Sequence, residues 1–244
     1  MNNIWITGDV HSNTSSFKQR INSYIQEADE TDSLICLGDV GIKYGEQTQG
    51  SLRKEMKKFP GTIYVMRGNH DTRYWRDYSF DDSWVVEDNL LYQKKYDNIK
   101  YIKDWGGLYN INDNNILFIP GAYSIDKYYR LNKGYPYEFD EQLSWKEQNS
   151  LYDLAIANKN NIDYVCSHTA PYCTQPYYKD LFLSFIDQSQ IDNHMEKFLD
   201  EIYSIVGKNV KRWYFGHYHD DRNVSTNFTM LYTKIVKLGE KVEG

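Results

Sequence analysis

Residues 62–71 read TIYVMRGNHD, and the fold that we predict follows from the strand and turn that they indicate. Its first half, Thr62–Met66, is β-branched and aromatic and lies between Pro60-Gly61 and Gly68, as is typical of a buried strand that ends in a tight turn. Ligands of open α/β sheets bind outside the carboxyl ends of the strands, so the polar residues Asn69-His70-Asp71 are a candidate site. Taken alone, an Asn/Asp-rich turn that happens to contain a histidine explains them equally well.

A similar arrangement, a strand followed by glycine and a polar residue that can bind metal, occurs twice earlier in the chain. Ile4–Ile6 precedes Gly8-Asp9, and Ser33–Leu37 precedes Gly38-Asp39. Helical periodicity follows each of them, at about 17–28 and 52–59, and alternating strands and helices predict a mainly parallel sheet with right-handed crossovers. Asp9, Asp39 and Asn69 are spaced 30 residues apart, about one βαβ unit, so we expect their turns at one edge of the sheet.

The middle of the chain shows weaker patterns. We expect an irregular excursion with short strands at about 73–103, and a hairpin formed by 105–111 and 115–119 that begins a second sheet. Residues 120–140 are expected to form a long irregular loop, and long structured loops tend to be functional. The remaining expected elements are helices at about 141–157 and 191–206, and strands at 162–166, at 210–215 and within 224–238.

Composition limits the classes of protein to which the chain can belong. Its 244 residues contain no linker or low-complexity run, so we expect a single domain over residues 1–244. The net charge is −6 and no basic run exceeds two residues, which argues against a long duplex nucleic acid held by charge. Three cysteines without Cys-x-x-Cys spacing, no signal peptide and no apolar run of membrane length lead us to expect a cytoplasmic protein with no membrane partner.

Five of the six histidines directly follow expected strands, and His194 is the exception. Imidazole and oxygen ligands without a thiolate suit manganese, iron, zinc or nickel rather than a structural zinc site. The candidate ligands are too many for one tetrahedral ion and suit two. They are Asp9, His11, Asp39, Asn69, His168, His217 and His219. Two divalent cations would add four positive charges, which makes a small anionic substrate more plausible.

The order of these blocks resembles the calcineurin-like metallophosphoesterase superfamily over nearly the whole chain. The matching blocks are Asp9-x-His11, Gly38-Asp39, Gly68-Asn69-His70-Asp71, His168 and Gly216-His217-x-His219. The resemblance implies a four-layer α/β/β/α sandwich of two mixed β-sheets, with a dinuclear site at the carboxyl ends of the strands. By motif position it implies one ion held by Asp9, His11, Asp39 and His219. It implies a second ion held by Asn69, His168 and His217 together with Asp39, which would bridge.

The resemblance also implies an activity. Two divalent or trivalent ions, manganese first and iron, zinc or nickel as alternatives, would activate a bridging hydroxide for in-line attack on phosphorus. His70 is the expected general acid for the departing alkoxide, and Asp71 would orient that imidazole or hold the turn. The expected substrate is a small phosphodiester or nucleotide-like phosphate. Lys127 and Arg130 are the candidate residues that bind this substrate. The alternative is that Arg130 pairs with Asp126 and that the tyrosines of the 120–140 loop only pack against the loop itself.

Two other functions remain as alternatives to the phosphodiesterase. One is a phosphomonoesterase, including a protein phosphatase, but protein phosphatases of this superfamily carry Gly-Asp-x-Val-Asp-Arg-Gly where this chain has Gly38-Asp39-Val40-Gly41. The other is a metal-binding scaffold without turnover. Because every expected ligand and His70 are present, we expect an enzyme.

Overall fold

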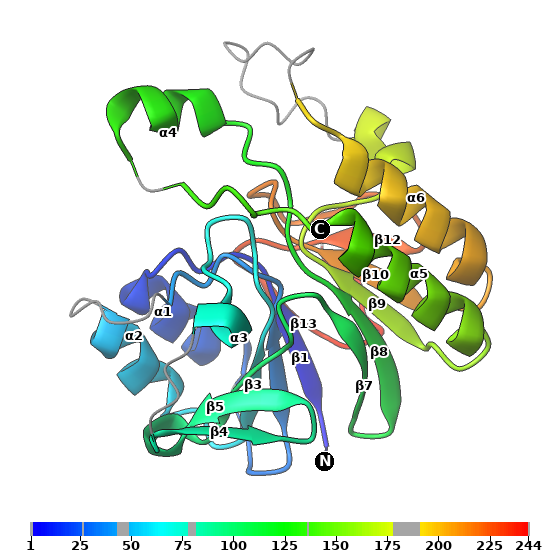
Figure 1. The fold of residues 1–244 in the computed structure, drawn as a ribbon. Coiled ribbons are helices and arrows are strands. Elements are labelled where there is room, and N and C mark those ends of the chain that lie inside the picture. Colours follow the sequence, from blue (N-terminus) through cyan, green and yellow to red (C-terminus); the bar gives the residue numbers. More distant parts are fainter. Residues whose placement is uncertain are drawn as a thin grey trace.

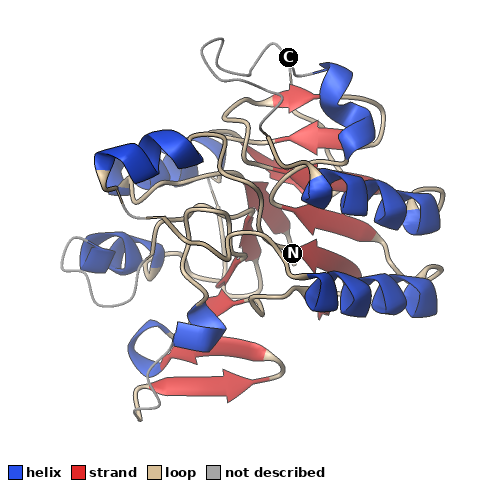
Figure 2. Ribbon diagram, turned by 45° about the horizontal axis from the view of Figure 1, so that its top comes forward, coloured by secondary structure: helices blue, strands red, loops and turns tan. Residues whose placement is uncertain are grey.

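Two mixed β-sheets lie face to face at the centre of the molecule, and helices cover the outer face of each sheet (Figure 1). The structure is a computed structural model that describes residues 2–25, 27–42, 49–77, 82–135, 137–177 and 191–243. In a second view the central strands again lie between helices, and a two-stranded hairpin projects at one edge (Figure 2). The predicted four-layer α/β/β/α sandwich is confirmed.

The first sheet has the strand order β13-β1-β2-β3-β6-β5-β4. Its parallel centre consists of β1 (Ile4–Thr7), β2 (Ser33–Cys36) and β3 (Thr62–Val65). The helices α1 (Thr14–Tyr24) and α2 (Gln49–Met56) connect these strands, and each returns the chain to the edge where the previous strand began. The turns that follow the three strands therefore lie at one edge, as the 30-residue spacing predicts.

The excursion at 73–103 adds the expected short strands to the same sheet. It contains α3 (Tyr74–Asp77), β4 (Trp84–Glu87), β5 (Leu90–Gln93), a 3₁₀ turn η1 (Lys94–Tyr96) and β6 (Ile99–Tyr101), while 78–81 lie outside the described residues. β6 pairs in parallel with β3. β5 pairs antiparallel with β4 and β6, and at the other edge β13 (Ile235–Lys237) pairs antiparallel with β1, so the sheet is mixed.

The second sheet has the order β11-β12-β10-β9-β8-β7. The predicted hairpin of β7 (Gly107–Ile111) and β8 (Asn114–Ile119) begins it, as expected. The other strands are β9 (Tyr164–Ser167), β10 (Arg212–Phe215), β11 (Arg222–Asn223) and β12 (Phe228–Met230). A 3₁₀ turn η2 (Tyr172–Tyr177) follows β9, and α5 (Trp145–Asn158) and α6 (His194–Val206) cover the outer face (Figure 1). α5 begins later than predicted because Ser144 and Glu147 form a capping box.

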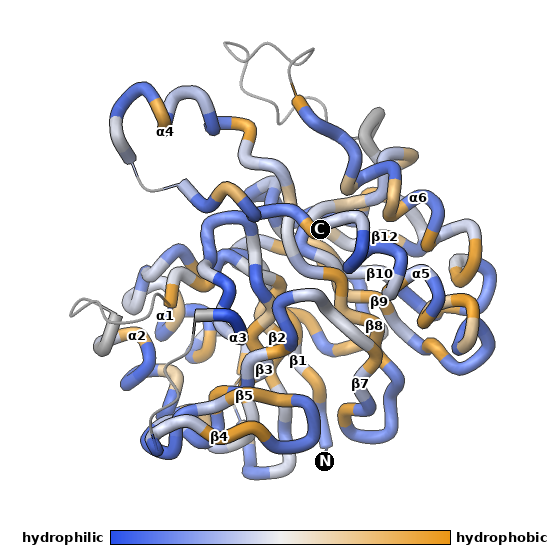
Figure 3. Tube along the Cα trace, in the orientation of Figure 1, coloured by the Kyte–Doolittle hydropathy of each residue, from blue (hydrophilic) through white to orange (hydrophobic). Residues whose placement is uncertain are grey.

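Apolar side chains fill three layers between these elements. Successive residues of a strand point to opposite faces, so Leu34 packs toward α1 and α2 whereas Ile35 packs between the sheets. The layer between α5, α6 and the second sheet includes Leu199 and Trp213. Colouring by hydropathy shows the same distribution, with apolar strands inside polar loops (Figure 3). In the described part of the chain we find no helix that is both long and apolar enough to cross a membrane.

The prediction of an irregular loop at 120–140 is wrong for residues 127–133, which form the helix α4 (Lys127–Lys133). Two local features stabilise this helix. Asp126 and Arg130 form an ion pair four residues apart, and Gly134 closes the helix at a φ of 66° while its N–H donates to the carbonyls of Arg130 and Leu131. α4 lies beyond the ends of the strands, apart from both helical layers (Figure 1). Pro136 lies outside the described residues.

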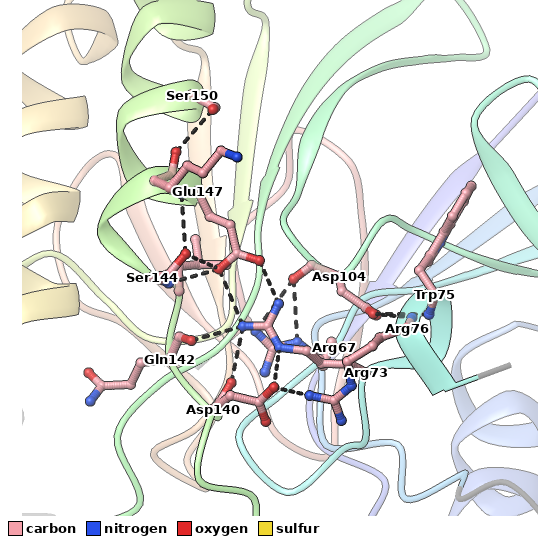
Figure 4. Close-up of polar contacts among 12 residues, drawn as sticks. Arg67, Arg73, Trp75, Arg76, Asp104, Asp140, Gln142, Ser144, Glu147 and Ser150 are labelled. Atoms are coloured by element: carbon pink, nitrogen blue, oxygen red, sulfur yellow. Dashed lines mark hydrogen bonds and ion pairs between the residues drawn. The ribbon is translucent and has the colours of Figure 1, made fainter.

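Two arginines and two carboxylates join the loop after β3 to the start of α5 (Figure 4). Arg73 is only 8% exposed, and its guanidinium pairs with Asp140 at 2.8 Å and with Glu147 at 2.6 Å. Arg76 pairs with the same Asp140 carboxylate from a more exposed position. We call Arg73, Arg76, Asp140 and Glu147 the arginine clasp. The clasp holds the chain at the point where it returns from α4 to the core.

Replacing Arg73 with methionine should lower the free energy of unfolding by about 1–3 kcal/mol, because it removes charge-assisted hydrogen bonds from a largely buried site. Arg76→Met is the matched control, and it should cost less than about 1 kcal/mol because that pair is exposed to water. Urea unfolding followed by circular dichroism measures both. Equal losses in the two variants would contradict the buried role of Arg73.

Candidate metal centre

The turns after β1, β2 and β3 meet the turns after β9 and β10 at the carboxyl ends of the strands. Direct contacts join them: His217 N–H donates to Asp9 at 3.0 Å, and the backbone N–H of His70 donates to Asp39 at 2.8 Å. The structure therefore brings all seven predicted ligands and His70 to one place. The sixth histidine, His194, lies at the start of α6 and pairs with Asp192 instead.

One part of the cluster consists of Asp9, His11 and His219. The Nε2 atoms of His11 and His219 are 2.8 Å apart, and His11 Nε2 is 4.0 Å from Asp9 Oδ1. The ring of Tyr232 stacks on His219 with centroids 4.8 Å apart. The ligand atoms of the three residues lie within 4.8 Å of one another, so one ion can contact all of them.

The other part surrounds Asn69. Its Oδ1 lies 2.8 Å from His168 Nε2 and 3.0 Å from His217 Nδ1. His168 Nδ1 lies 2.7 Å from the carbonyl oxygen of Leu37, which only accepts hydrogen bonds, so Nδ1 carries a proton and Nε2 faces the centre.

A second compact group consists of Asp9, Asp39 and His168. Asp39 Oδ1 is 3.6 Å from His168 Nε2. Asp9 thus belongs to both compact groups, whereas the resemblance places the bridge at Asp39. A ligand oxygen of Asp9 lies within 4.8 Å of one of Asp39, so either carboxylate is a candidate for a ligand shared by two ions.

The electrostatics of the cluster favour bound cations. Burial raises the pKa of Asp9 to about 7, although His168 acts to lower it. Burial acts to raise the pKa of Asp39, but His168, His70 and His11 together outweigh it and the net pKa is lowered. Burial acts to lower the pKa of His168, but Asp39, Asp9 and the Leu37 carbonyl together outweigh it and raise the pKa to about 9. Two buried carboxylates need nearby positive charge, and carboxylate, amide and imidazole donors fit manganese, iron, zinc or nickel.

The backbone at the cluster adopts conformations that are costly for residues with side chains. φ is 50° at His11, 48° at Asp39, 69° at His217 and 54° at His219. Among the described residues, the other non-glycine positions with positive φ are Ser12, beside His11, and the tips of two hairpins, where tight turns require it. Those tips are Asp88-Asn89 and Asn112-Asp113. Strain of this kind collects at functional sites, where the surrounding fold imposes it.

Glycines before the ligands allow the turns to approach one another. A Cβ at Gly68 would lie 2.1 Å from Asp39 Oδ1, and a Cβ at Gly38 would lie 2.4 Å from His168 Nδ1. Gly38 also has a φ of 101°, which side chains disfavour. The Gly-Asp and Gly-Asn pairs of the sequence therefore reflect this close approach.

Asp71 connects two of the ligand turns. Its carboxylate accepts hydrogen bonds from the backbone N–H groups of Gly68 at 2.9 Å, Gly41 at 2.9 Å and Val40 at 3.3 Å. Burial raises its pKa to about 6, and Asp39 acts in the same direction. The sequence left two roles open for Asp71, namely orienting the His70 imidazole or holding the turn. These hydrogen bonds to backbone N–H groups are those of a residue that holds the turn.

A cavity of about 160 Å³ opens beside the cluster. The residues that line it are His11, Ser12, Gly41, Asn69, His70, Arg130, Tyr137 and Glu138. Burial lowers the pKa of His70, and Asp39 opposes that shift. The imidazole of His70 lines this cavity next to the candidate ligands, and it belongs to neither compact group.

The two predicted substrate residues differ in position. Arg130 lines the cavity, and its Nε pairs with Asp126 Oδ2 at 2.8 Å, as the alternative interpretation predicted. Lys127 is absent from the described lining of the cavity. Its Nζ lies 5.5 Å from the ring centre of Tyr123 and 5.4 Å from that of Tyr137.

Two polar residues that contact Asn69 directly or through one another, Ser124 and Glu141, were not among the predicted site residues. Asn69 Nδ2 donates to Ser124 Oγ at 2.8 Å, and the Ser124 hydroxyl donates to the carboxylate of Glu141. Glu141 was expected only as the first residue of a helix. The sequence carries no periodic signal for this contact, because the loop that contains α4 separates the two residues.

Comparison with known proteins gives one family. The family model described as calcineurin-like phosphoesterase matches residues 3–221. No curated protein matches the chain significantly. Among solved structures, the protein of unknown function AQ665 from Aquifex aeolicus is similar at 15% identity, over 68% of this chain and 80% of that chain, with a TM-score of 0.34.

Asp39→Asn should remove more bound metal than His11→Ala or His217→Ala, because a bridging carboxylate offers an oxygen to each of two ions while an imidazole binds one. Elemental analysis of the purified variants measures the loss. Asp9→Asn is the matched comparison, since Asp9 belongs to both compact groups. A larger loss in Asp9→Asn would move the bridge to Asp9, and two ions per chain with normal turnover in Asp39→Asn would refute the dinuclear assignment.

Proposed function

The chain belongs to the calcineurin-like phosphoesterase family, and on that premise we propose that this metal-dependent phosphoester hydrolase acts on a small phosphodiester or nucleotide-type phosphate. One observation carries the proposal. The cavity beside the candidate ligands has a volume of about 160 Å³, and its lining includes Arg130 and Tyr137 from the segment that contains α4. A cavity bounded in this way suits a phosphate group and its neighbouring atoms better than a phosphorylated residue on the surface of a folded protein.

The seven candidate ligands are proposed to hold two ions, with manganese as the first candidate. When bound, such a pair neutralises phosphate charge and activates water for in-line attack. The strained turns hold the ligands before substrate arrives, so little rearrangement is needed. Asp71 acts as a positioning residue because its carboxylate keeps the turns after β2 and β3 together.

His70 is proposed as the general acid. Its ring borders the cavity, and a phosphate anion placed there would favour the protonated imidazole. The imidazolium can then donate its proton to the departing alkoxide oxygen, an effect worth about 100-fold to 10,000-fold in rate.

Features of the α4 segment support a nucleotide-type diester. Arg130 offers a planar cation to phosphate oxygens, and Tyr137 lines the same cavity. Tyr128, Tyr129 and Tyr135 on this segment are about half exposed and are available to a base that extends beyond the cavity. Stacking on such rings contributes about 1–3 kcal/mol per base. Glu138 also lines the cavity, and its carboxylate repels a dianionic monoester more strongly than a monoanionic diester.

His70→Ala should reduce turnover while the metal content holds, because the proton donor lies outside the proposed ligand set. The loss should be larger for esters with alkoxide-like leaving groups than for bis-p-nitrophenyl phosphate, whose nitrophenolate needs little protonation. Steady-state kinetics on both esters, with elemental analysis of the same preparations, makes the comparison. Equal losses on both would remove the general-acid role.

Arg130→Ala should raise KM for a nucleotide diester about tenfold, equivalent to about 1.4 kcal/mol, with little effect on bis-p-nitrophenyl phosphate. Lys133→Ala is the control on the same helix and should leave both values unchanged. Two results would contradict a role in substrate binding: an unchanged KM for every nucleotide tested, or an equal rise in KM for bis-p-nitrophenyl phosphate. In either case the role of Arg130 would be limited to its ion pair with Asp126.

A further inference from the structure

A chain of hydrogen bonds runs from the cavity wall through the buried interior to Asn69. The hydroxyl of Tyr137 donates to Glu141 Oε1 at 2.8 Å, and the backbone N–H of Ser124 donates to the same oxygen at 2.9 Å. The Ser124 hydroxyl donates to Glu141 Oε2, and Asn69 Nδ2 donates to Ser124 Oγ. Ser124, Glu141 and Asn69 are each 2% exposed, so water has little access to them.

The directions of these bonds depend on one another. An ionised carboxylate only accepts, so the Ser124 hydroxyl must direct its single proton toward Glu141. The lone pairs of Ser124 Oγ then face Asn69, which can present only its NH₂ group there. The carbonyl oxygen of the Asn69 amide is left facing His168 and His217.

We propose that Glu141 is a positioning residue that acts through Ser124 to hold the amide oxygen of Asn69 toward the metal centre. The inference rests on the proposed function, because it requires Asn69 to be a ligand. An amide turned by 180° would present NH₂ to a cation and repel it. The carboxylate of Glu141 thus determines whether residue 69 can bind metal at all.

The same carboxylate also holds one wall of the cavity. Tyr137 lines the cavity and donates to Glu141, and the buried guanidinium of Arg67 donates to the Glu141 carbonyl at 2.8 Å. The segment that follows α4 is therefore attached to the ligand turn after β3 from two directions. Glu141 thus contacts both Tyr137 in the cavity lining and Ser124, the residue that orients the Asn69 amide.

Glu141→Gln tests the direction of the bonds at nearly constant shape. The backbone N–H of Ser124 can only donate, so it holds the substituted amide with its oxygen at the position of Oε1 and its NH₂ at that of Oε2. The NH₂ group then donates to Ser124 Oγ, the hydroxyl proton turns toward Asn69, and the Asn69 amide reverses. We expect a 10- to 100-fold loss of Mn²⁺ affinity at one site, measured by calorimetry on metal-stripped protein.

Ser124→Ala removes the connection without reversing it, so its loss of Mn²⁺ affinity should be smaller than that of Glu141→Gln. The double variant should return to the level of Ser124→Ala, because the substituted amide can no longer act on Asn69. A merely structural role for Glu141 predicts the opposite, namely additive losses in the double variant. Additive losses, or unchanged affinity in Glu141→Gln, would overturn the proposal.

Three further variants keep the result interpretable. Asn69→Ala tests the premise: unchanged Mn²⁺ affinity there refutes Asn69 as a ligand and with it this part of the proposed function. A loss in Asn69→Ala combined with none in Glu141→Gln refutes the Glu141 role alone. Ser150→Ala on the exposed face of α5 is the matched serine control and should bind Mn²⁺ normally. If Glu141→Gln fails to fold, Ser124→Ala must still lose affinity and Ser124→Thr must retain it, or the proposal fails.

Discussion

Two buried carboxylates, Asp9 and Asp39, set the central constraint on this structure. Neither has appreciable contact with water, and each lies within a few ångströms of histidines. Removing two negative charges from water is expensive unless positive charge and hydrogen bonds replace the lost solvation. The fold meets this requirement in part by placing imidazoles and the backbone N–H groups of His70 and His217 around them, and bound cations would supply further positive charge.

Parallel strands provide the geometry for that arrangement. β1, β2 and β3 run side by side in the first sheet, while β9 and β10 do so in the second, so their carboxyl ends deliver five turns to one place. Glycines allow those turns to approach within contact distance, and four of the candidate ligand residues adopt backbone angles that are unfavourable for residues with a side chain. Burial of apolar side chains on both faces of each sheet stabilises the fold and offsets the energetic cost of this backbone strain. The 120–141 segment then adds a cavity wall, fastened by the arginine clasp and by Glu141.

The parts of the site predictable from sequence are those with local signals. A β-branched run that ends in glycine and a polar residue marks both a strand and its turn, so the positions of Asp39 and Asn69 followed directly. α4 was missed because it is short and depends on the Asp126–Arg130 pair and on Gly134 rather than on an apolar stripe. The partnership of Asn69 with Ser124 and Glu141 depends on tertiary packing between distant segments. The position of Lys127 over two tyrosine rings depends on side-chain packing for which spacing gives no signal.

The central claim is that the buried carboxylates and their histidines form a two-metal phosphoesterase centre. The most direct measurement is a titration of chelator-stripped protein with Mn²⁺, in which bound metal per chain and hydrolysis of bis-p-nitrophenyl phosphate are followed together. We expect binding to saturate at two ions per chain, and hydrolysis, absent from the stripped protein, to appear as the sites fill. Saturation at a single ion, or hydrolysis that persists undiminished in the stripped protein, would contradict it.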